Sequence, residues 1–247
     1  MLDWLFFLFG LIIGSFLNVC IYRLPQGESL LYPSSHCRSC QASLLALDLV
    51  PVVGYILLRG RCRYCSKPFS VRYAGVELFT GLLFLHAWKL LGLGPELLKV
   101  LLFIAFLITI TFIDVDHQLI MDKVLGCMLA VGMALNLFLG IPPAGNFLLA
   151  GLGAGGVMLL LAVISRGGMG GGDIKLAAVL GIWLGWPYIV LALLLAFLAG
   201  GVIGALLLLL RIKGRKDSIP FGPFLTAGAY ITAIYGNEWL FWYLSLL

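Results

Sequence analysis

Charged side chains are scarce in this sequence. Asp, Glu, Lys and Arg make up 11% of its 247 residues, whereas hydrophobic residues make up 62%. Several apolar runs approach the length of about 20 residues that a helix needs to cross a bilayer. The runs are continuous and do not alternate with polar positions, which favours helices over a transmembrane barrel. The composition therefore predicts an all-α, polytopic membrane protein.

Two common catalytic signatures are also missing. No Gly-x-Ser-x-Gly elbow occurs, which argues against a serine hydrolase. No Gly-x-Gly-x-x-Gly follows a predicted strand, so a Rossmann-type nucleotide site is not expected. We also find no convincing repeat between the halves of the chain, which a transporter built from inverted repeats would show.

The first apolar run, residues 2–21, predicts a membrane span that is retained. A cleavable signal peptide carries positive charge before its apolar core, but here Asp3 precedes the core and Arg23 follows it. Small and polar residues let membrane helices approach closely. The run therefore has a predicted helix-packing face, formed by Gly14, Ser15 and Asn18.

Changes in composition divide the chain into three parts. These are a first transmembrane helix at 1–24, a soluble basic segment at 25–73 and a membrane-embedded core at 74–247. Together with the first span, the core gives a bundle of about eight transmembrane helices. The core spans are expected at residues 74–92, 97–113, 119–140, 146–165, 174–186, 188–210 and 220–236.

The distribution of Lys and Arg predicts the orientation of these spans. When successive loops are assigned to alternate sides, one side receives only Lys89 and Lys99. By the positive-inside rule, the opposite side faces the cytoplasm. Attraction to anionic membrane lipid explains its charge without a nucleic-acid partner. That side carries the basic residues of segment 25–73 together with Lys123, Arg166, Lys175, Arg211, Lys213, Arg215 and Lys216.

Two aspartates reach this cytoplasmic side from distant parts of the sequence. Asp114 ends the charge-free run 100–113, and Asp173 follows the glycine-rich stretch 168–172. Ionisable residues beside the hydrocarbon usually face a bundle interior or an aqueous cavity and mark a functional path. The alternative for Asp173 is an N-cap of a helix that begins at Ile174. We interpret their polar neighbours as boundary residues, namely Asp116, His117 and Asp122.

A pair of aspartates held close together can hydrolyse a peptide without a covalent intermediate. The two carboxyls share a proton, so that one acts as a base on water while the other polarises the peptide carbonyl. The glycines before Asp173 would let a loop bend around a peptide substrate. The sequence thus indicates an aspartic peptidase core within residues 74–247.

The soluble segment 25–73 contains two cysteine pairs, Cys37-x-x-Cys40 and Cys62-x-x-Cys65, separated by 21 residues. Two pairs at this spacing are typical of a four-thiolate zinc site. Disulfides are the alternative, but they are rare in the reducing cytoplasm, where the charge distribution places this segment. Because all four ligands are protein thiolates, the zinc is expected to be structural.

Taken together, these motifs resemble those of the bacterial type IV prepilin peptidases, which are Gly-x-Gly-Asp membrane aspartic proteases. The motifs occur in the family's order from the first span to the last. The sequence departs from the family at Ile120-Met121-Asp122 and at Tyr73-Ala74, where the family usually has a proline. Besides the cysteine pairs, the matching stretches are Gly14-Ser15-Phe16-Leu17-Asn18-Val19, Leu58-Arg59-Gly60-Arg61-Cys62-Arg63, Arg72-Tyr73, Val76-Glu77-Leu78, Phe112-Ile113-Asp114, Gly168-Met169-Gly170-Gly171-Gly172-Asp173-Ile174-Lys175-Leu176 and Ile219-Pro220-Phe221-Gly222-Pro223.

The resemblance implies a bifunctional enzyme of the bacterial inner membrane. Such enzymes remove the short basic leader of prepilins and pseudopilins after a glycine at the cytoplasmic face, and then N-methylate the new terminal residue with S-adenosylmethionine. Their substrates serve type IV pili, secretion or DNA uptake. The resemblance further implies that Asp114 and Asp173 are the catalytic pair, and that Cys37, Cys40, Cys62 and Cys65 are the zinc ligands.

Some features leave alternatives open. Glu77, within the apolar span 74–92, is a candidate for a functional intramembrane carboxylate, and a structural hydrogen-bonding residue explains it equally well. A related Gly-x-Gly-Asp protease with other substrates, of the preflagellin peptidase or presenilin type, would share the aspartates but not the cysteine segment. A non-enzymatic zinc-loop scaffold, or a transporter with carboxylates along its path, is the alternative from another class.

Overall fold

The computed structural model describes residues 1–140, 142–165, 168–214 and 218–245. Within these residues the chain is helical, and apart from two isolated bridges it contains no strand there. The all-α prediction is confirmed. The chain divides into two units, residues 1–109 and 110–247, which are described separately. Three basic residues of the charge distribution, Arg166, Arg215 and Lys216, lie outside the described residues.

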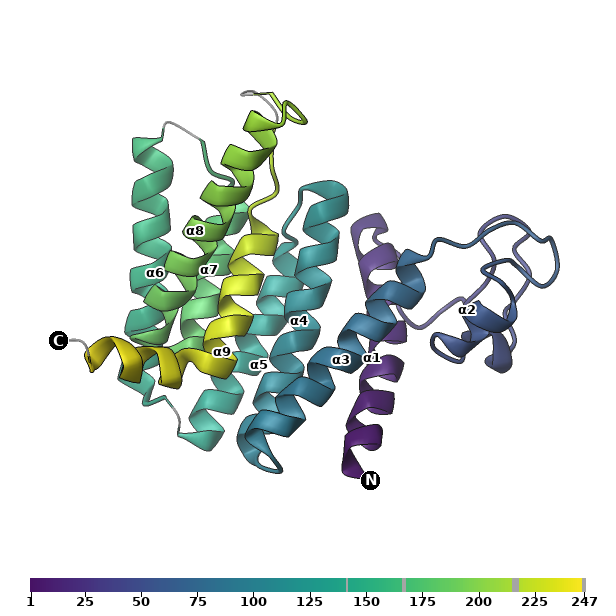
Figure 1. The fold of residues 1–247 in the computed structure, drawn as a ribbon, viewed down its shortest axis with the longest axis horizontal. Helices are drawn as coiled ribbons and strands as arrows, with labels where there is room; N and C mark the ends of the chain where they lie inside the picture. Colours follow the sequence, from purple (N-terminus) through teal and green to yellow (C-terminus); the bar gives the residue numbers. More distant parts are fainter. Residues whose placement is uncertain (141, 166–167, 215–217, 246–247) are drawn as a thin grey trace. The chain divides into compact units, whose positions relative to one another are not determined.

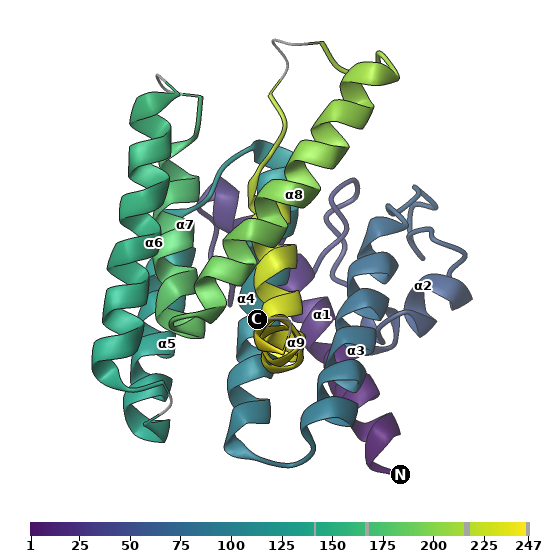
Figure 2. The same cartoon turned by 60° about the vertical axis from the view of Figure 1, so that its left-hand side comes forward.

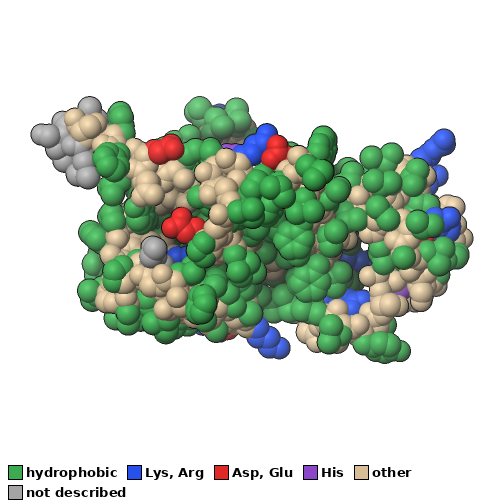
Figure 3. Space-filling model, turned by 90° about the horizontal axis from the view of Figure 1, so that it is seen from below, with side chains coloured by type: hydrophobic (Ala, Val, Ile, Leu, Met, Phe, Trp, Pro, Cys, Tyr) green, Lys and Arg blue, Asp and Glu red, His purple; other side chains and the backbone are tan. Residues whose placement is uncertain are grey.

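Most of the helices have the length and composition of membrane spans. The helix α7 (Gly171–Leu184) occupies the third-last predicted span and α9 (Gly222–Leu244) the last one, and the total of eight spans stays a prediction. Hydrophobic side chains are spread over the face seen in Figure 3, among backbone and other side chains, with a few charged side chains between them. The protein is therefore a multi-pass membrane protein. Six described helices are long and apolar enough to cross a bilayer: α1 (Leu2–Gln26), α3 (Arg72–Leu91), α4 (Pro95–His117), α5 (Asp122–Leu139), α6 (Ala144–Ile164) and α8 (Tyr188–Leu209).

In the first unit, α1 and α3 pack along each other (Figures 1 and 2). A Cβ atom added to Gly14 of α1 would lie 2.7 Å from Cα of Glu77 in α3, so only glycine allows this approach. The side-chain amide of Asn18 donates a hydrogen bond to the carbonyl of Tyr73, 2.9 Å away. The predicted packing face of the first span is confirmed at both residues. The helix continues through Pro25, beyond the predicted end of the span.

The segment between α1 and α3 contains the 3-10 helix η1 (Ala46–Leu49) and the short helix α2 (Val53–Leu57). Its beginning is held by Arg23, which is only 6% exposed. The Arg23 guanidinium donates hydrogen bonds to the carbonyls of Ser29 and Pro33, at 2.9 and 2.7 Å. A buried arginine thus ties this soluble segment to the last turn of α1.

The second unit is built around α7, which contacts α5, α6, α8 and α9. A Cβ atom on Gly181 would lie 2.5 Å from the carbonyl oxygen of Ala150, which shows how closely α6 and α7 pack (Figure 2). The indole N–H of Trp183 donates to the carbonyl of Met128 in α5, 2.9 Å away. Because its neighbours bury it, α7 fixes the position of Asp173 in its first turn.

Candidate active site and metal centre

Asp114 lies one turn before the end of α4 and is 5% exposed. Its Oδ2 atom accepts a hydrogen bond from the backbone N–H of Gly222, the first residue of α9, at 3.0 Å. A Cβ atom on Gly222 would lie 2.5 Å from the same oxygen. The start of α9 therefore reaches Asp114 only because residue 222 has no side chain.

Asp173 lies in the first turn of α7, and the helix begins earlier than predicted. The N-cap is Gly170, which makes no side-chain capping bond, and the helix starts at Gly171. The alternative of Asp173 as the N-cap is therefore wrong. Its carboxyl instead accepts a hydrogen bond from the backbone of Gly170. This is the carboxylate half of a capping box, in which the third helical residue reaches back to the cap.

The structure brings the two predicted aspartates into one region of the second unit. The carboxyl of Asp173 interacts electrostatically with Asp114. The segment after α4 also passes over the start of α7, since a Cβ atom on Gly172 would lie 2.9 Å from Cβ of Ile120. Two interacting carboxyls can share a proton and divide the tasks of acid and base between them.

Other polar residues hold this region together without joining the pair. Asp122, at the start of α5, forms an ion pair with Lys175, whose Nζ atom donates to the two carboxylate oxygens at 2.7 and 2.9 Å. Its side chain is 71% exposed, as expected of a boundary residue. The hydroxyl of Ser218 donates to Oε1 of Gln118 at 2.7 Å, which links the end of α4 to the segment before α9.

The four cysteines of the soluble segment form one cluster in the first unit. Their sulfur atoms all lie within 4.8 Å of one another. The distances between the sulfurs of Cys37 and Cys65 and of Cys40 and Cys62 are 3.7 and 4.0 Å. A tetrahedral zinc ion with Zn–S distances of about 2.3 Å separates its sulfurs by about 3.8 Å. The cluster has the donors and the size to hold such a metal ion.

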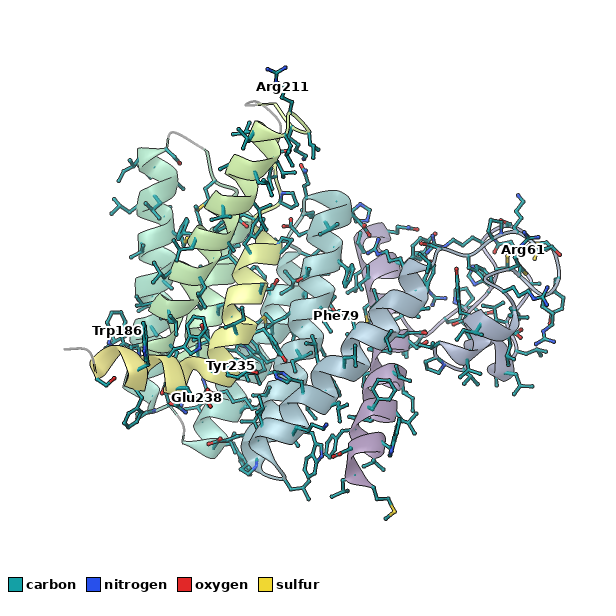
Figure 4. The ribbon with its side chains drawn as sticks, in the orientation of Figure 1. Arg61, Phe79, Trp186, Arg211, Tyr235 and Glu238 are labelled. Carbon is teal, nitrogen blue, oxygen red and sulfur yellow. The ribbon has the colours of Figure 1, made fainter. Side chains whose placement is uncertain are left out.

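The two cysteine pairs adopt the same backbone conformation. In the first, the N–H of Gln41 donates to the carbonyl of Cys37 at 2.8 Å, and in the second, the N–H of Ser66 donates to that of Cys62 at 2.9 Å. Gln41 and Ser66 are both left-handed, with φ of 58° and 56°. Arg61, labelled in Figure 4, precedes Cys62 in the second turn. The two turns thus present their sulfurs in equivalent ways.

Backbone hydrogen bonds and one ion pair surround the cluster. Backbone N–H groups of Cys40 and Ser39 lower the pKa of the Cys37 thiol, which favours the thiolate that a metal requires. Burial and hydrogen bonds from the other thiols instead raise the pKa of the Cys65 thiol. Next to the cluster, Arg63 forms an ion pair with Asp48 of η1 at 2.5 Å. The Arg63 guanidinium holds the pKa of the Asp48 carboxyl below its usual range. This pair links the second cysteine turn to η1.

Comparisons with known proteins cover almost the whole chain. Residues 8–90 match the bacterial peptidase A24 N-terminal domain, and residues 101–205 match the type IV leader peptidase family. The chain is 36% identical to the prepilin leader peptidase/N-methyltransferase of Aeromonas hydrophila, over 99% of this chain and 96% of that protein. It is 33% identical to the protein of that name from Bacillus subtilis (strain 168), over 97% of each.

The protein of that name from Legionella pneumophila is 36% identical, over 96% of this chain and 93% of the relative. No solved structure matches the chain. The scaffold and transporter alternatives do not account for relatives matched along almost their whole length. The chain belongs to the prepilin leader peptidase/N-methyltransferase family.

Proposed function

We propose that the protein removes the basic leader peptide of type IV prepilins and pseudopilins after a glycine, at the cytoplasmic face of the bacterial inner membrane. The names of its relatives support this substrate class. The observation that carries the proposal is the arrangement of two carboxyls at helix ends in the second unit: Asp114, held by the N–H of Gly222, and Asp173, whose helix start packs against Ile120. The basic residues of segment 25–73 support the cytoplasmic orientation.

In the proposed mechanism, one carboxylate takes a proton from a water molecule while the other carboxyl donates a hydrogen bond to the scissile carbonyl. The water oxygen adds to the carbonyl carbon and forms a tetrahedral intermediate. The C–N bond then breaks, the electron pair stays on nitrogen, and a carboxyl proton completes the leaving amine. The N–H of Gly222 orients Asp114 for this step.

Two further groups belong to the proposal. The four-cysteine cluster holds a structural zinc ion through Cys37, Cys40, Cys62 and Cys65. The enzyme also N-methylates the new N-terminus, for which S-adenosylmethionine supplies an activated methyl group when it is bound. The protein would hold this donor beside the new amine, and the proton that the amine loses on methylation would pass to solvent.

The test is a mass-spectrometric cleavage assay in detergent with a prepilin substrate and S-adenosylmethionine. Asp114→Asn and Asp173→Asn are each expected to lower the cleavage rate about 10²- to 10⁴-fold, the usual contribution of a positioned acid or base. The matched control is Asp122→Asn, which changes an exposed carboxylate of the same region and is expected to keep cleavage. Full cleavage by either Asn variant, with normal metal content and elution volume, would rule out the pair.

A further inference from the structure

A cavity of about 360 Å³ lies within the first unit, between α1, α3 and the cysteine segment. Its volume falls in the range of about 300–1,000 Å³ that is typical of small-molecule sites. The first cysteine turn contributes Cys37 to the wall, so the metal cluster borders the cavity. The polar groups that line it include Ser15, Asn18, Tyr22, Arg38, Tyr73 and Glu77.

Two buried carboxyl side chains line this cavity, Asp48, which pairs with Arg63, and Glu77, which is 8% exposed. Glu77 accepts a hydrogen bond from the N–H of Val52 at 2.7 Å. Within the described part of the chain it forms no ion pair with a basic side chain. Burying a carboxylate without a cation is costly. A positively charged ligand in the cavity would offset that cost.

A second wall of the cavity is aromatic and basic. The guanidinium carbon of Arg38 lies 3.3 Å from the ring centroid of Tyr22 and 5.6 Å from that of Tyr73. Arg38 also donates a hydrogen bond to the Tyr73 hydroxyl. Arg38 thus covers one face of the Tyr22 ring, while the Tyr73 ring offers a flat π-surface to a heteroaromatic ring. The exposed guanidinium can also pair with a carboxylate.

We propose that this cavity binds the methyl donor, an adenosyl sulfonium compound of the S-adenosylmethionine class. Three of its chemical groups have a partner here: the sulfonium cation with Glu77, the adenine ring with Tyr73, and the amino-acid carboxylate with Arg38, which Tyr22 supports from one side. The inference rests on the methylation part of the proposed function. The inference also assigns a role to the metal, because the cysteine turn that it would hold contains Arg38 and forms part of the cavity wall.

The first test maps the donor on the wild-type protein. Radiolabelled S-adenosylmethionine is cross-linked to the full chain by ultraviolet light, and the labelled peptides are sequenced by mass spectrometry. The label is expected on peptides from 15–38 or 67–77, and excess S-adenosylhomocysteine is expected to suppress it. Label confined to peptides after residue 109, or label that S-adenosylhomocysteine does not compete for, would overturn the inference.

The second test uses variants. Equilibrium dialysis measures how tightly each variant binds S-adenosylhomocysteine and how well added S-adenosylmethionine displaces it. Glu77→Gln keeps the side-chain size and an acceptor for Val52, and it is expected to weaken S-adenosylmethionine binding roughly tenfold or more, because the buried charge pair between carboxylate and sulfonium is lost. Ala74→Leu is expected to weaken binding of both compounds by filling the cavity, whose wall includes Ala74. The matched control, Glu96→Gln, changes an exposed carboxylate outside the cavity.

Leader removal separates this inference from the proposed function. In both cavity variants the ratio of methylated to unmethylated cleavage product is expected to fall, whereas Glu96→Gln, outside the cavity, is expected to keep cleavage and methylation at the wild-type level. Unchanged donor binding in both variants would refute the cavity as the site even if the wild type cleaves and methylates. Absence of cleavage by the wild type would refute the peptidase proposal and would leave the cross-linking result to decide the cavity on its own.

Discussion

The backbone N–H of Gly222 and the Oδ2 atom of Asp114 are joined by a 3.0 Å hydrogen bond that links α9 to α4 inside the second unit. The bond restricts the orientation of a carboxyl that is almost completely buried. It also uses one lone pair of Oδ2, so the remaining oxygen of Asp114 is the better placed to face a substrate.

Gly222→Ala is expected to lower prepilin cleavage about tenfold to a hundredfold, because its Cβ would lie 2.5 Å from Asp114 Oδ2 and push the two apart. The loss of a hydrogen bond to a charged group costs about 1.5–3 kcal/mol, which corresponds to that range. The rate is measured in the mass-spectrometric assay. Gly201→Ala in α8 is the control, since its Cβ would meet open space. Equal rates for the two variants would contradict this account of Gly222.

Purified protein is expected to contain one zinc ion per chain, and any single Cys→Ser change in the cluster is expected to lower that content. The reason is that three thiolates leave one position of the tetrahedron open. Metal content is measured by inductively coupled plasma mass spectrometry, and limited proteolysis reports cuts between α1 and α3. Cys127→Ser is the control, because Cys127 lies in α5 and outside the cluster. Full zinc content after Cys37→Ser would show that the metal is held elsewhere.

The close contact between α6 and α7 predicts that a substitution there lowers the stability of the protein and leaves the two aspartates unchanged. Gly181→Ala is expected to destabilise the protein by about 1–3 kcal/mol, because its Cβ would lie 2.5 Å from the backbone oxygen of Ala150 and backbone cannot easily move away. Thermal unfolding in detergent provides the measurement. Gly153→Ala, also in the bundle but facing open space, should leave the melting temperature unchanged or slightly higher. A similar melting temperature for both variants would argue against close packing here.

The ion pair of Arg63 and Asp48 predicts a pH effect at the soluble segment. Arg63 lowers the folded-state pKa of Asp48 below the usual value of about 3.9. The pair therefore stabilises the folded segment above that value, and the contribution is lost as the pH falls through the lower folded pKa. In Arg63→Gln the pKa of Asp48 is expected to rise toward its usual value, as followed by carboxyl ¹³C NMR. An unchanged titration would mean that the guanidinium is not its main partner.

Local patterns in the sequence were sufficient for several of these features. Apolar runs predicted the helices, and the Cys-x-x-Cys spacing predicted the cluster that the four thiols form in space, because both depend on residues close together in the chain. Helix ends were less accurate. The helix that begins at Gly171 was expected to begin at Ile174, since glycine is a poor helix former and tertiary packing overrides that preference here.

The sequence did not reveal the contacts that depend on tertiary structure. The donor to Asp114 is a backbone group of Gly222, which leaves no chemical mark in a sequence, although the stretch 219–223 already matched a family motif. The cavity beside Glu77 also combines residues from α1, α3 and the intervening segment. Only packing shows that these residues surround one space.

The short length of α7 has a consequence for how the protein meets membranes of different thickness. Its 14 residues extend about 21 Å, less than the hydrocarbon core of about 30 Å. Four helices surround it, so it does not have to match the lipid. Hydrophobic mismatch then acts on the outer helices, which can tilt. The position of the aspartate at the start of α7 is therefore fixed by its protein neighbours. A change in bilayer thickness is expected to move it little.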